Sequence, residues 1–191
     1  MSKRNTDLDW LVVVVKVPKE PSRHRVAVWR ELRRQGAVQL SPGTWAIPDL
    51  AVYRELLQRV RETVADADGE LTVLTVCPDA ESDHAHLTEA FRAARAEEWT
   101  ELVADCMKLI DEIAREIDKQ KFTFAELEEE EQSLDRLRRW YRTLRARDVL
   151  DDPLRVVADT HLDACTAALT DFEQRVFAGP VDQSRRRPGI G

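Results

Sequence analysis

The spacing of hydrophobic and polar positions changes along this chain at about residue 77. Residues 10–17 form a nearly continuous apolar run with four consecutive valines, which is typical of a buried strand. Residues 22–35 and 49–66 instead repeat apolar positions every three or four residues, which predicts two helices. The remaining apolar segments of this first part predict three further strands, at 37–40, 44–47 and 70–77.

Local signals place the turns and the helix faces of this first part. Ser41-Pro42-Gly43 predicts a tight turn, because proline presets φ at the second position and glycine accepts a positive φ at the third. Ser22 stands at the expected N-cap of the first helix. Val26, Val28, Trp29 and Leu32 are the apolar residues of the first helix, and the 26/29/32 spacing predicts the stripe that faces the sheet. The order strand, helix, two strands, helix, strand predicts an α+β protein with a ferredoxin-like βαββαβ domain over residues 1–77.

The second part of the chain has only helical spacing. Apolar residues from 87 to 117 predict one long helix. Thr123 and Glu126 fit a capping box, with Phe122 and Leu127 as the surrounding hydrophobic staple, so a new helix is expected to begin there. A last helix follows Asp152-Pro153. We therefore expect an antiparallel helical domain over residues 78–178 and a disordered basic tail over 179–191.

Charge is distributed in blocks, although the net charge of the 191 residues is only −7. Residues 16–34 carry seven basic and two acidic side chains, and residues 134–148 carry six arginines and two aspartates. Between them, residues 97–131 carry thirteen acidic and four basic side chains. Such blocks predict surfaces with separate tasks, or charge neutralisation within the molecule. The run Glu128 to Glu131 is expected to be exposed in the first turns of its helix.

The cysteines and the apolar runs predict the cellular compartment of the protein. Cys77, Cys106 and Cys165 are odd in number and lack metal-ligand spacing, which predicts reduced thiols and no disulfide framework. No apolar run approaches the roughly 20 residues that a membrane span requires. The N-terminus lacks the apolar segment of a secretion signal. We expect a cytoplasmic protein without metal or cofactor.

Several segments together resemble the N-terminal domain of the chromate-resistance regulator family ChrB. The resemblance covers roughly residues 8 to 178 and is carried by residues 10–18, 21–38, 42–48, 121–128 and 145–148. It implies a chromate-responsive transcriptional regulator that binds promoter DNA of a chromate-resistance operon. Full-length members carry a further C-terminal domain, and this sequence ends after the first.

The first half is also similar to the middle domain of PaaX-type repressors, which in turn resembles small CRISPR nucleases. Those nucleases carry a metal-binding aspartate near the end of the first strand. Here the corresponding segment is Val15-Lys16-Val17, and a lysine repels a metal ion. The chain also has no P-loop, no GxGxxG and no Ser/His/Asp arrangement. We therefore expect that the protein is not an enzyme.

Two sets of basic residues are candidates for contact with DNA phosphates. Basic side chains on one surface supply the salt-dependent part of nucleic-acid affinity. The candidates are Lys16, Lys19, Arg23, Arg25, Arg30, Arg33 and Arg34 in the first half, and Arg138, Arg139 and Arg142 in the second. The other interpretation is that these arginines pair with the acidic block inside the molecule, and the sequence pI of about 5.2 favours it.

Ser22, Arg23 and Arg25 are candidates for binding chromate. Chromate is a dianion shaped like sulfate, and guanidinium groups with free amides at a helix start suit such a ligand. Ordinary capping with solvent-facing arginines would explain the same residues.

Two functions remain open from the sequence. The first is a DNA-binding regulator with chromate as its effector, and the alternative is a non-enzymatic oxyanion sensor or interaction module that acts with a separate partner. Either is expected to be a homodimer through the sheet or its edge, because exposed edge strands are commonly covered by a second copy.

Overall fold

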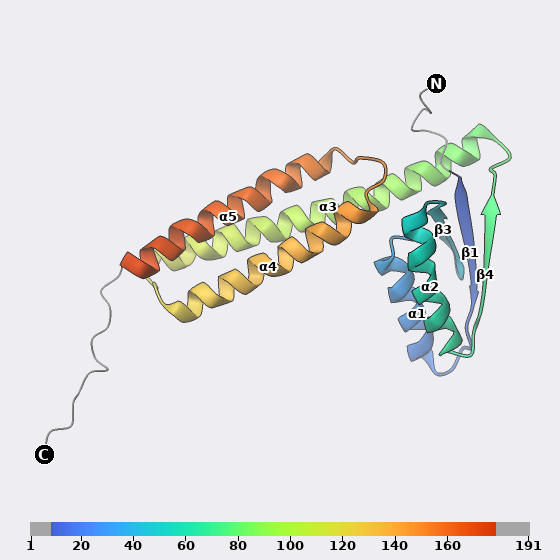
Figure 1. Ribbon diagram of the computed structural model, residues 1–191, viewed down its shortest axis with the longest axis horizontal. Helices are drawn as coiled ribbons and strands as arrows, with labels where there is room; N and C mark the ends of the chain where they lie inside the picture. Colours follow the sequence, from blue (N-terminus) through green and yellow to red (C-terminus); the bar gives the residue numbers. More distant parts are fainter. Residues whose placement is uncertain (1–8, 179–191) are drawn as a thin grey trace, which may run out of the picture. The chain divides into compact units, whose positions relative to one another are not determined.

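The computed structural model describes residues 9–178 and confirms the α+β class, with a small four-stranded antiparallel sheet and five helices (Figure 1). The tail predicted over 179–191 lies outside the described residues. The elements in chain order are β1 (Trp10–Lys16), α1 (Ser22–Arg34), β2 (Val38–Ser41), β3 (Thr44–Pro48), α2 (Ala51–Ala65), β4 (Glu70–Val76), α3 (Glu81–Asp118), α4 (Phe124–Arg147) and α5 (Leu154–Ala178).

The valine-rich strand β1 lies in the interior of the sheet, as its apolar run predicts. The strand order is β2-β3-β1-β4 and every pair is antiparallel. The β2–β3 turn depends on Gly43, which has a φ of +77° and lies where a Cβ would be 2.7 Å from the carbonyl oxygen of Val15. The Val15 amide also donates to the Gly43 carbonyl at 2.7 Å, so this turn is held against β1.

Helix α1 faces the sheet with a different stripe from the predicted one. Val28 and Leu32 are buried, whereas Val26 and Trp29 are each 43% exposed. The prediction from the 26/29/32 spacing was therefore wrong for two of its three residues. Ser22 is likewise not the N-cap: it is the first residue of the helix, Pro21 precedes it, and no side-chain hydrogen bond caps this end.

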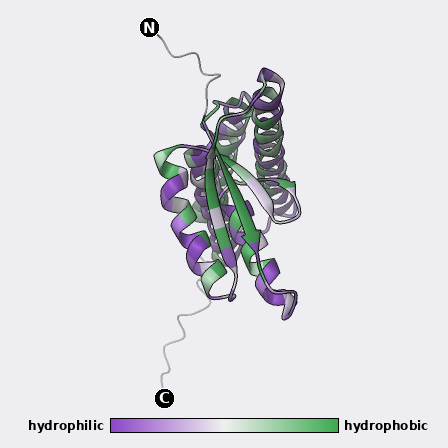
Figure 2. Ribbon diagram, turned by 90° about the vertical axis from the view of Figure 1, so that its right-hand side faces the viewer, coloured by the Kyte–Doolittle hydropathy of each residue, from purple (hydrophilic) through white to green (hydrophobic). Residues whose placement is uncertain are grey.

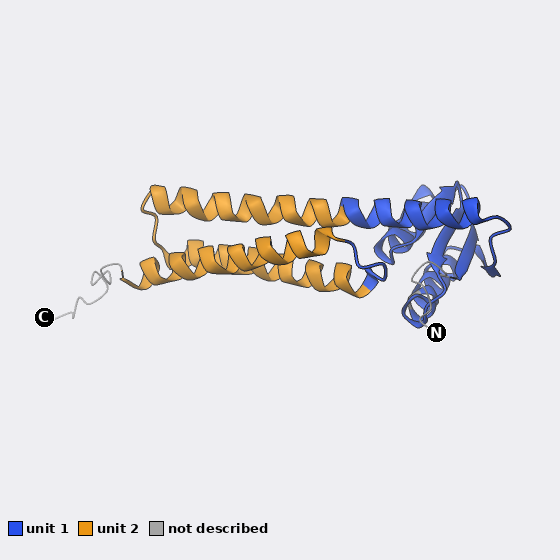
Figure 3. Cartoon of the chain, turned by 90° about the horizontal axis from the view of Figure 1, so that it is seen from above, with its two compact units in different colours: residues 1–97, 147–152 blue, residues 98–146, 153–191 orange. Residues whose placement is uncertain are grey.

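The described chain divides into two compact units (Figure 3). Unit 1 contains the sheet, α1, α2, the part of α3 up to Glu97 and the segment 147–152. It extends past the boundary predicted at residue 77 because Phe91 of α3 is fully buried, with its ring centroid 6.0 Å from that of Trp10 and 6.2 Å from that of Tyr53.

Unit 2 contains the rest of α3, α4 up to Ala146, and α5. These helices share a core that includes Leu102, Leu134 and Phe172. At the start of α4 the Thr123 half of the predicted capping box forms, because the Glu126 amide donates to Thr123 Oγ1 at 3.3 Å. The Thr123 amide donates instead to the Lys121 carbonyl at 3.2 Å, and the Glu126 carboxylate accepts from the Lys121 ammonium. Of the expected staple, Leu127 is buried and Phe122 half-buried, packed against the same core.

Candidate nucleic-acid interface

Helix α1 separates its side chains into a buried polar-apolar face and an exposed basic face. The buried residues Val28, Glu31, Leu32 and Gln35 recur at helical spacing. The opposite face carries Arg23, Val26, Trp29, Arg30 and Arg33, all exposed. At 100° per residue, Arg23 and Arg30 lie almost in line along the helix. Because the buried face of α1 packs against the sheet, this basic face is exposed to solvent within unit 1.

Trp29 is the unexpected member of this face. The Arg33 guanidinium carbon lies 5.4 Å from the centroid of the Trp29 ring, which is a cation–π distance. A half-exposed tryptophan next to arginines provides a flat surface for stacking together with positive charge for phosphates. Sequence reasoning had placed Trp29 in the core, so the exposed ring is a functional candidate that it missed.

The buried face of α1 can hold polar residues because the Glu31 carboxylate has hydrogen-bond donors next to it. Glu31 accepts hydrogen bonds from Arg34 and Gln35. Burial opposes ionisation of this carboxyl, but the hydrogen bonds from Arg34 and Gln35, together with the positive charges of Arg34 and Arg59, outweigh burial and lower the pKa of Glu31. Arg34 is thus engaged within its own helix, and is a weaker candidate for DNA than Arg23 or Arg30.

The C-terminal end of α1 is held by an arginine from a distant part of the chain. Arg147 is 6% exposed and donates to the carbonyl oxygens of Arg33, at 3.3 Å, and of Arg34. Its own carbonyl accepts a 2.7 Å hydrogen bond from the Tyr53 hydroxyl. A cation at a helix C-terminus also stabilises the helix dipole. Arg147 is therefore a positioning residue for α1, although its sequence position groups it with the basic strip of 134–148.

The two lysines among the candidate DNA-binding residues precede α1 in the chain. Lys16 is the last residue of β1, and Lys19 is in the following loop, both exposed. The Lys16 ammonium lies 3.6 Å from a Glu70 carboxylate oxygen on β4. An exposed pair of this kind contributes little to stability, so Lys16 remains accessible to another anion.

The second basic strip lies on α4 in unit 2. Arg139 and Arg142 are exposed, and Arg138 is half-buried. Arg138 donates to Thr166 Oγ1 on α5 at 3.2 Å and lies 3.8 Å from Asp135. Arg138 therefore contributes to packing between α4 and α5, and Arg139 and Arg142 are the accessible members.

Few of the candidate DNA-binding residues form ion pairs in residues 9–178. Of the ten candidate DNA-binding residues, three form ion pairs among the described residues: Lys16 with Glu70, Arg34 with Glu31, and Arg138 with Asp135. All three acidic partners lie outside the acidic block of 97–131. For the ten candidate residues, the ion pairs within residues 9–178 therefore do not support neutralisation by the acidic block.

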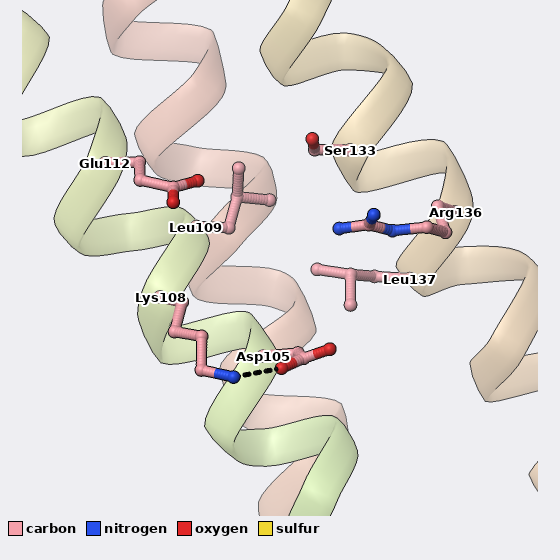
Figure 4. A pocket seen from close by; sticks show the side chains of 7 residues that line it. All are labelled: Asp105, Lys108, Leu109, Glu112, Ser133, Arg136 and Leu137. Atoms are coloured by element: carbon pink, nitrogen blue, oxygen red, sulfur yellow. Dashed lines mark hydrogen bonds and ion pairs between the residues drawn. The ribbon is translucent and has the colours of Figure 1, made fainter.

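A polar groove of about 260 Å³ lies between α3 and α4 in unit 2 (Figure 4). Asp105, Lys108 and Glu112 line it from α3, and Ser133 and Arg136 from α4. Lys108 Nζ donates to Asp105 at 2.7 Å. Because two carboxylates stand beside the two cations, the groove is close to neutral and does not favour an anion.

The three oxyanion candidates are all exposed at the start of α1. Arg23 and Arg25 are two residues apart, so their side chains leave the helix in directions about 200° apart. An oxyanion site at Ser22, Arg23 and Arg25 stays a prediction.

Two negative findings apply to residues 9–178. No cluster of three or more His, Cys, Asp or Glu side chains is arranged to hold a metal ion there. Within the same range, no helix combines the length and the apolar character that a membrane crossing requires.

Together these features define an α+β protein whose sheet unit carries an exposed basic helix and whose helical unit carries a second basic strip. The family model described as "Protein ChrB, N-terminal" matches residues 25–183, and the chain belongs to that family. The chain is similar to Protein ChrB of Cupriavidus metallidurans, with 31% identity over 91 residues. That alignment covers 47% of this chain and 28% of the relative.

Proposed function

We propose that this protein takes part in chromate-linked transcriptional regulation and binds promoter DNA through the exposed face of α1. Membership of the ChrB family supports the link to chromate resistance, as the sequence resemblance implies. The observation that carries the DNA contact is the face of Arg23, Arg30 and Arg33 around the half-exposed Trp29. In this proposal the chain is a binding protein and not an enzyme, and chromate is its effector.

The fold supports this proposal in two ways. The element order βαββαβ with strand order β2-β3-β1-β4 supports a ferredoxin-like plan for unit 1, which commonly serves binding and regulation. Such a sheet presents α1 as a rigid helix, and Arg147 fixes its C-terminal end. Rigid placement lowers the ordering cost of each phosphate contact.

Fluorescence anisotropy on the DNA upstream of the protein's own gene tests this function at about 50 mM and about 200 mM salt. The double variant Arg23→Gln/Arg30→Gln removes two exposed cations in line on α1. We expect the affinity to fall at least tenfold and the slope of log affinity against log salt to shrink by about 2, because two phosphate contacts are lost. The matched control is Arg59→Gln/Arg61→Gln, which removes two exposed arginines from α2 of the same unit.

A Trp29→Ala variant tests the stacking surface separately. We expect weaker binding with an unchanged salt slope, since no charge is removed. Equal loss of affinity in the α1 and α2 double variants would contradict an α1 interface. Binding that is absent even at the lower salt would favour a sensor or interaction module that acts with a partner.

The effector is tested by adding chromate, with sulfate as a control of the same shape and charge. Release of DNA by chromate alone supports a chromate-responsive regulator. Intact binding in the presence of chromate would overturn the effector while leaving the DNA contact in place.

A further inference from the structure

The two edges of the sheet differ in how they are protected. The edge strand β2 has four residues, a register irregularity between Gln39 and Ser41, and Pro42 directly after it. The Gln39 side chain also donates to the Ser41 carbonyl at 3.4 Å. Shortness, irregular register and a nearby proline are the features with which proteins block the pairing of an edge with another strand.

The other edge strand, β4, has none of these features. All seven of its residues pair with β1 in unbroken register, from Glu70 opposite Lys16 to Val76 opposite Trp10. Residues 71–76 contain no charge and no proline. Among the described residues β4 pairs with β1 alone, so its second edge is open. A long, regular, uncharged edge is a template for another strand.

After Glu70, the exposed side chains of β4 are apolar or weakly polar. Leu74 is 49% exposed, and Thr72 and Thr75 are also exposed. The register places Leu74 opposite Val12, and Thr72 opposite Val14, which is 40% exposed. Figure 2 shows the strands of the sheet in the foreground, largely in the hydrophobic colour. The edge therefore continues into an apolar surface that a partner strand would extend.

The sequence of β4 is complementary to itself in antiparallel pairing. About a twofold axis at Val73, Thr72 faces Leu74 of the other copy, and Leu71 faces Thr75. These pairs each join a leucine to a threonine, and Val73 faces Val73 of the other copy; both pairings are compatible in a sheet. The strand's one charge, Glu70, lies opposite Val76 of the other copy. The two Glu70 side chains are about 20 Å apart at 3.4 Å per residue, so no like charges meet.

We propose that β4 pairs antiparallel with β4 of a second copy of this chain, about a twofold axis at Val73, to form a continuous eight-stranded sheet. The interface is isologous, since the same strand is used on both sides. The assignment does not depend on DNA binding: a monomer could still bind DNA through α1, and a dimer could form without it.

Charge variants at the facing positions test this pairing. Thr72→Lys/Leu74→Lys places lysine opposite lysine twice, and we expect a monomer in sedimentation or light scattering. Thr72→Lys/Leu74→Glu changes the same two exposed positions but places lysine opposite glutamate, and we expect a dimer. Leu40→Lys on β2 is the control at the protected edge and should stay dimeric. Circular dichroism checks that each variant is folded.

A distance measurement on the unchanged sequence gives an independent test. All three cysteines are free; Cys77 is exposed, whereas Cys106 and Cys165 are buried, so a spin label will attach to Cys77. Cys77 is four residues from the proposed axis, which predicts a separation of roughly 27 Å between the two Cα atoms. A monomeric native chain, the same oligomeric state for both charge variants, or a clearly different separation would overturn the assignment.

Discussion

Two buried ionisable groups, one in each unit, have nearly the same exposure and opposite surroundings. In unit 1, Arg147 is 6% exposed and its guanidinium donates to two backbone carbonyls at the end of α1. In unit 2, Glu130 is 5% exposed, and its charged neighbours are Glu112, Glu116, Glu126 and Glu129. The comparison shows that burial alone does not decide whether an ionisable group stabilises a fold; oriented partners or like charges decide it.

The largest expected effect comes from replacing Arg147, the buried group whose hydrogen-bond partners are well oriented. Arg147→Met keeps much of the side-chain volume but removes the donors to the carbonyls of Arg33 and Arg34. We expect unit 1 to lose about 3 kcal/mol, because buried acceptors of charge-assisted hydrogen bonds lose their donor. Hydrogen exchange with mass spectrometry should show faster exchange in α1 and α2 than in α5.

Arg145→Met is the matched control for this change. It lies two residues earlier on α4, is exposed, and should change stability by less than about 0.5 kcal/mol. Equal effects of the two substitutions would mean that Arg147 acts through general charge and not through its contacts with α1.

The second effect concerns the group with unfavourable neighbours and depends on pH. Burial, and then the surrounding carboxylates, raise the pKa of Glu130 to about 7. The folded state therefore holds this proton more tightly than the unfolded state, so the contribution of Glu130 to stability is fully present below pH 4.5 and is lost as the pH rises through 7. At pH 8 the protein carries a buried charge that Glu130→Gln removes.

From pH 4 to pH 8, we expect the difference in stability between Glu130→Gln and the native protein to shift by about 2 kcal/mol in favour of the variant. Urea unfolding at both pH values, monitored by the helical signal, measures this shift. Glu128→Gln removes an exposed glutamate of the same run and should show no such pH dependence. A parallel pH response of the two variants would contradict the role of burial.

These two groups also show how far the sequence could predict this molecule. The strands and the turn at Pro42-Gly43 followed from local patterns, because a valine run and a proline-glycine pair restrict the backbone by themselves. The run Glu128 to Glu131 was predicted to be exposed, but one of its four members points into the bundle. All four positions are glutamate in the sequence, and only the packing of α3 against α4 distinguishes Glu130 from the other three.

The face of α1 was mispredicted for a related reason. The buried face includes Glu31 and Gln35, which bond to each other and so tolerate burial. A search for apolar spacing excludes both residues and selects Val26 and Trp29 instead. The extension of unit 1 to Phe91 and to the segment 147–152 depends on contacts between residues far apart in sequence, which local periodicity does not encode. For the candidate interface, the sequence identified the arginines but not the exposed tryptophan among them.

The smallest effect concerns the helix start that the sequence predicted correctly. Thr123→Ala removes the Oγ1 that accepts from the Glu126 amide, and we expect unit 2 to lose about 1 kcal/mol. Thr160→Ala is the matched control in the same unit, since the Thr160 hydroxyl donates to the Val156 carbonyl inside α5. That hydroxyl competes with helical bonding and alanine favours a helix, so the control should be neutral or slightly stabilising.

Because a cap acts through a neutral hydrogen bond, the loss at Thr123 should be the same at pH 4 and pH 8, unlike the effect at Glu130. A loss at Thr123 that changed with pH would show that Glu126 and its ion pair with Lys121, and not the cap, set the stability of this end.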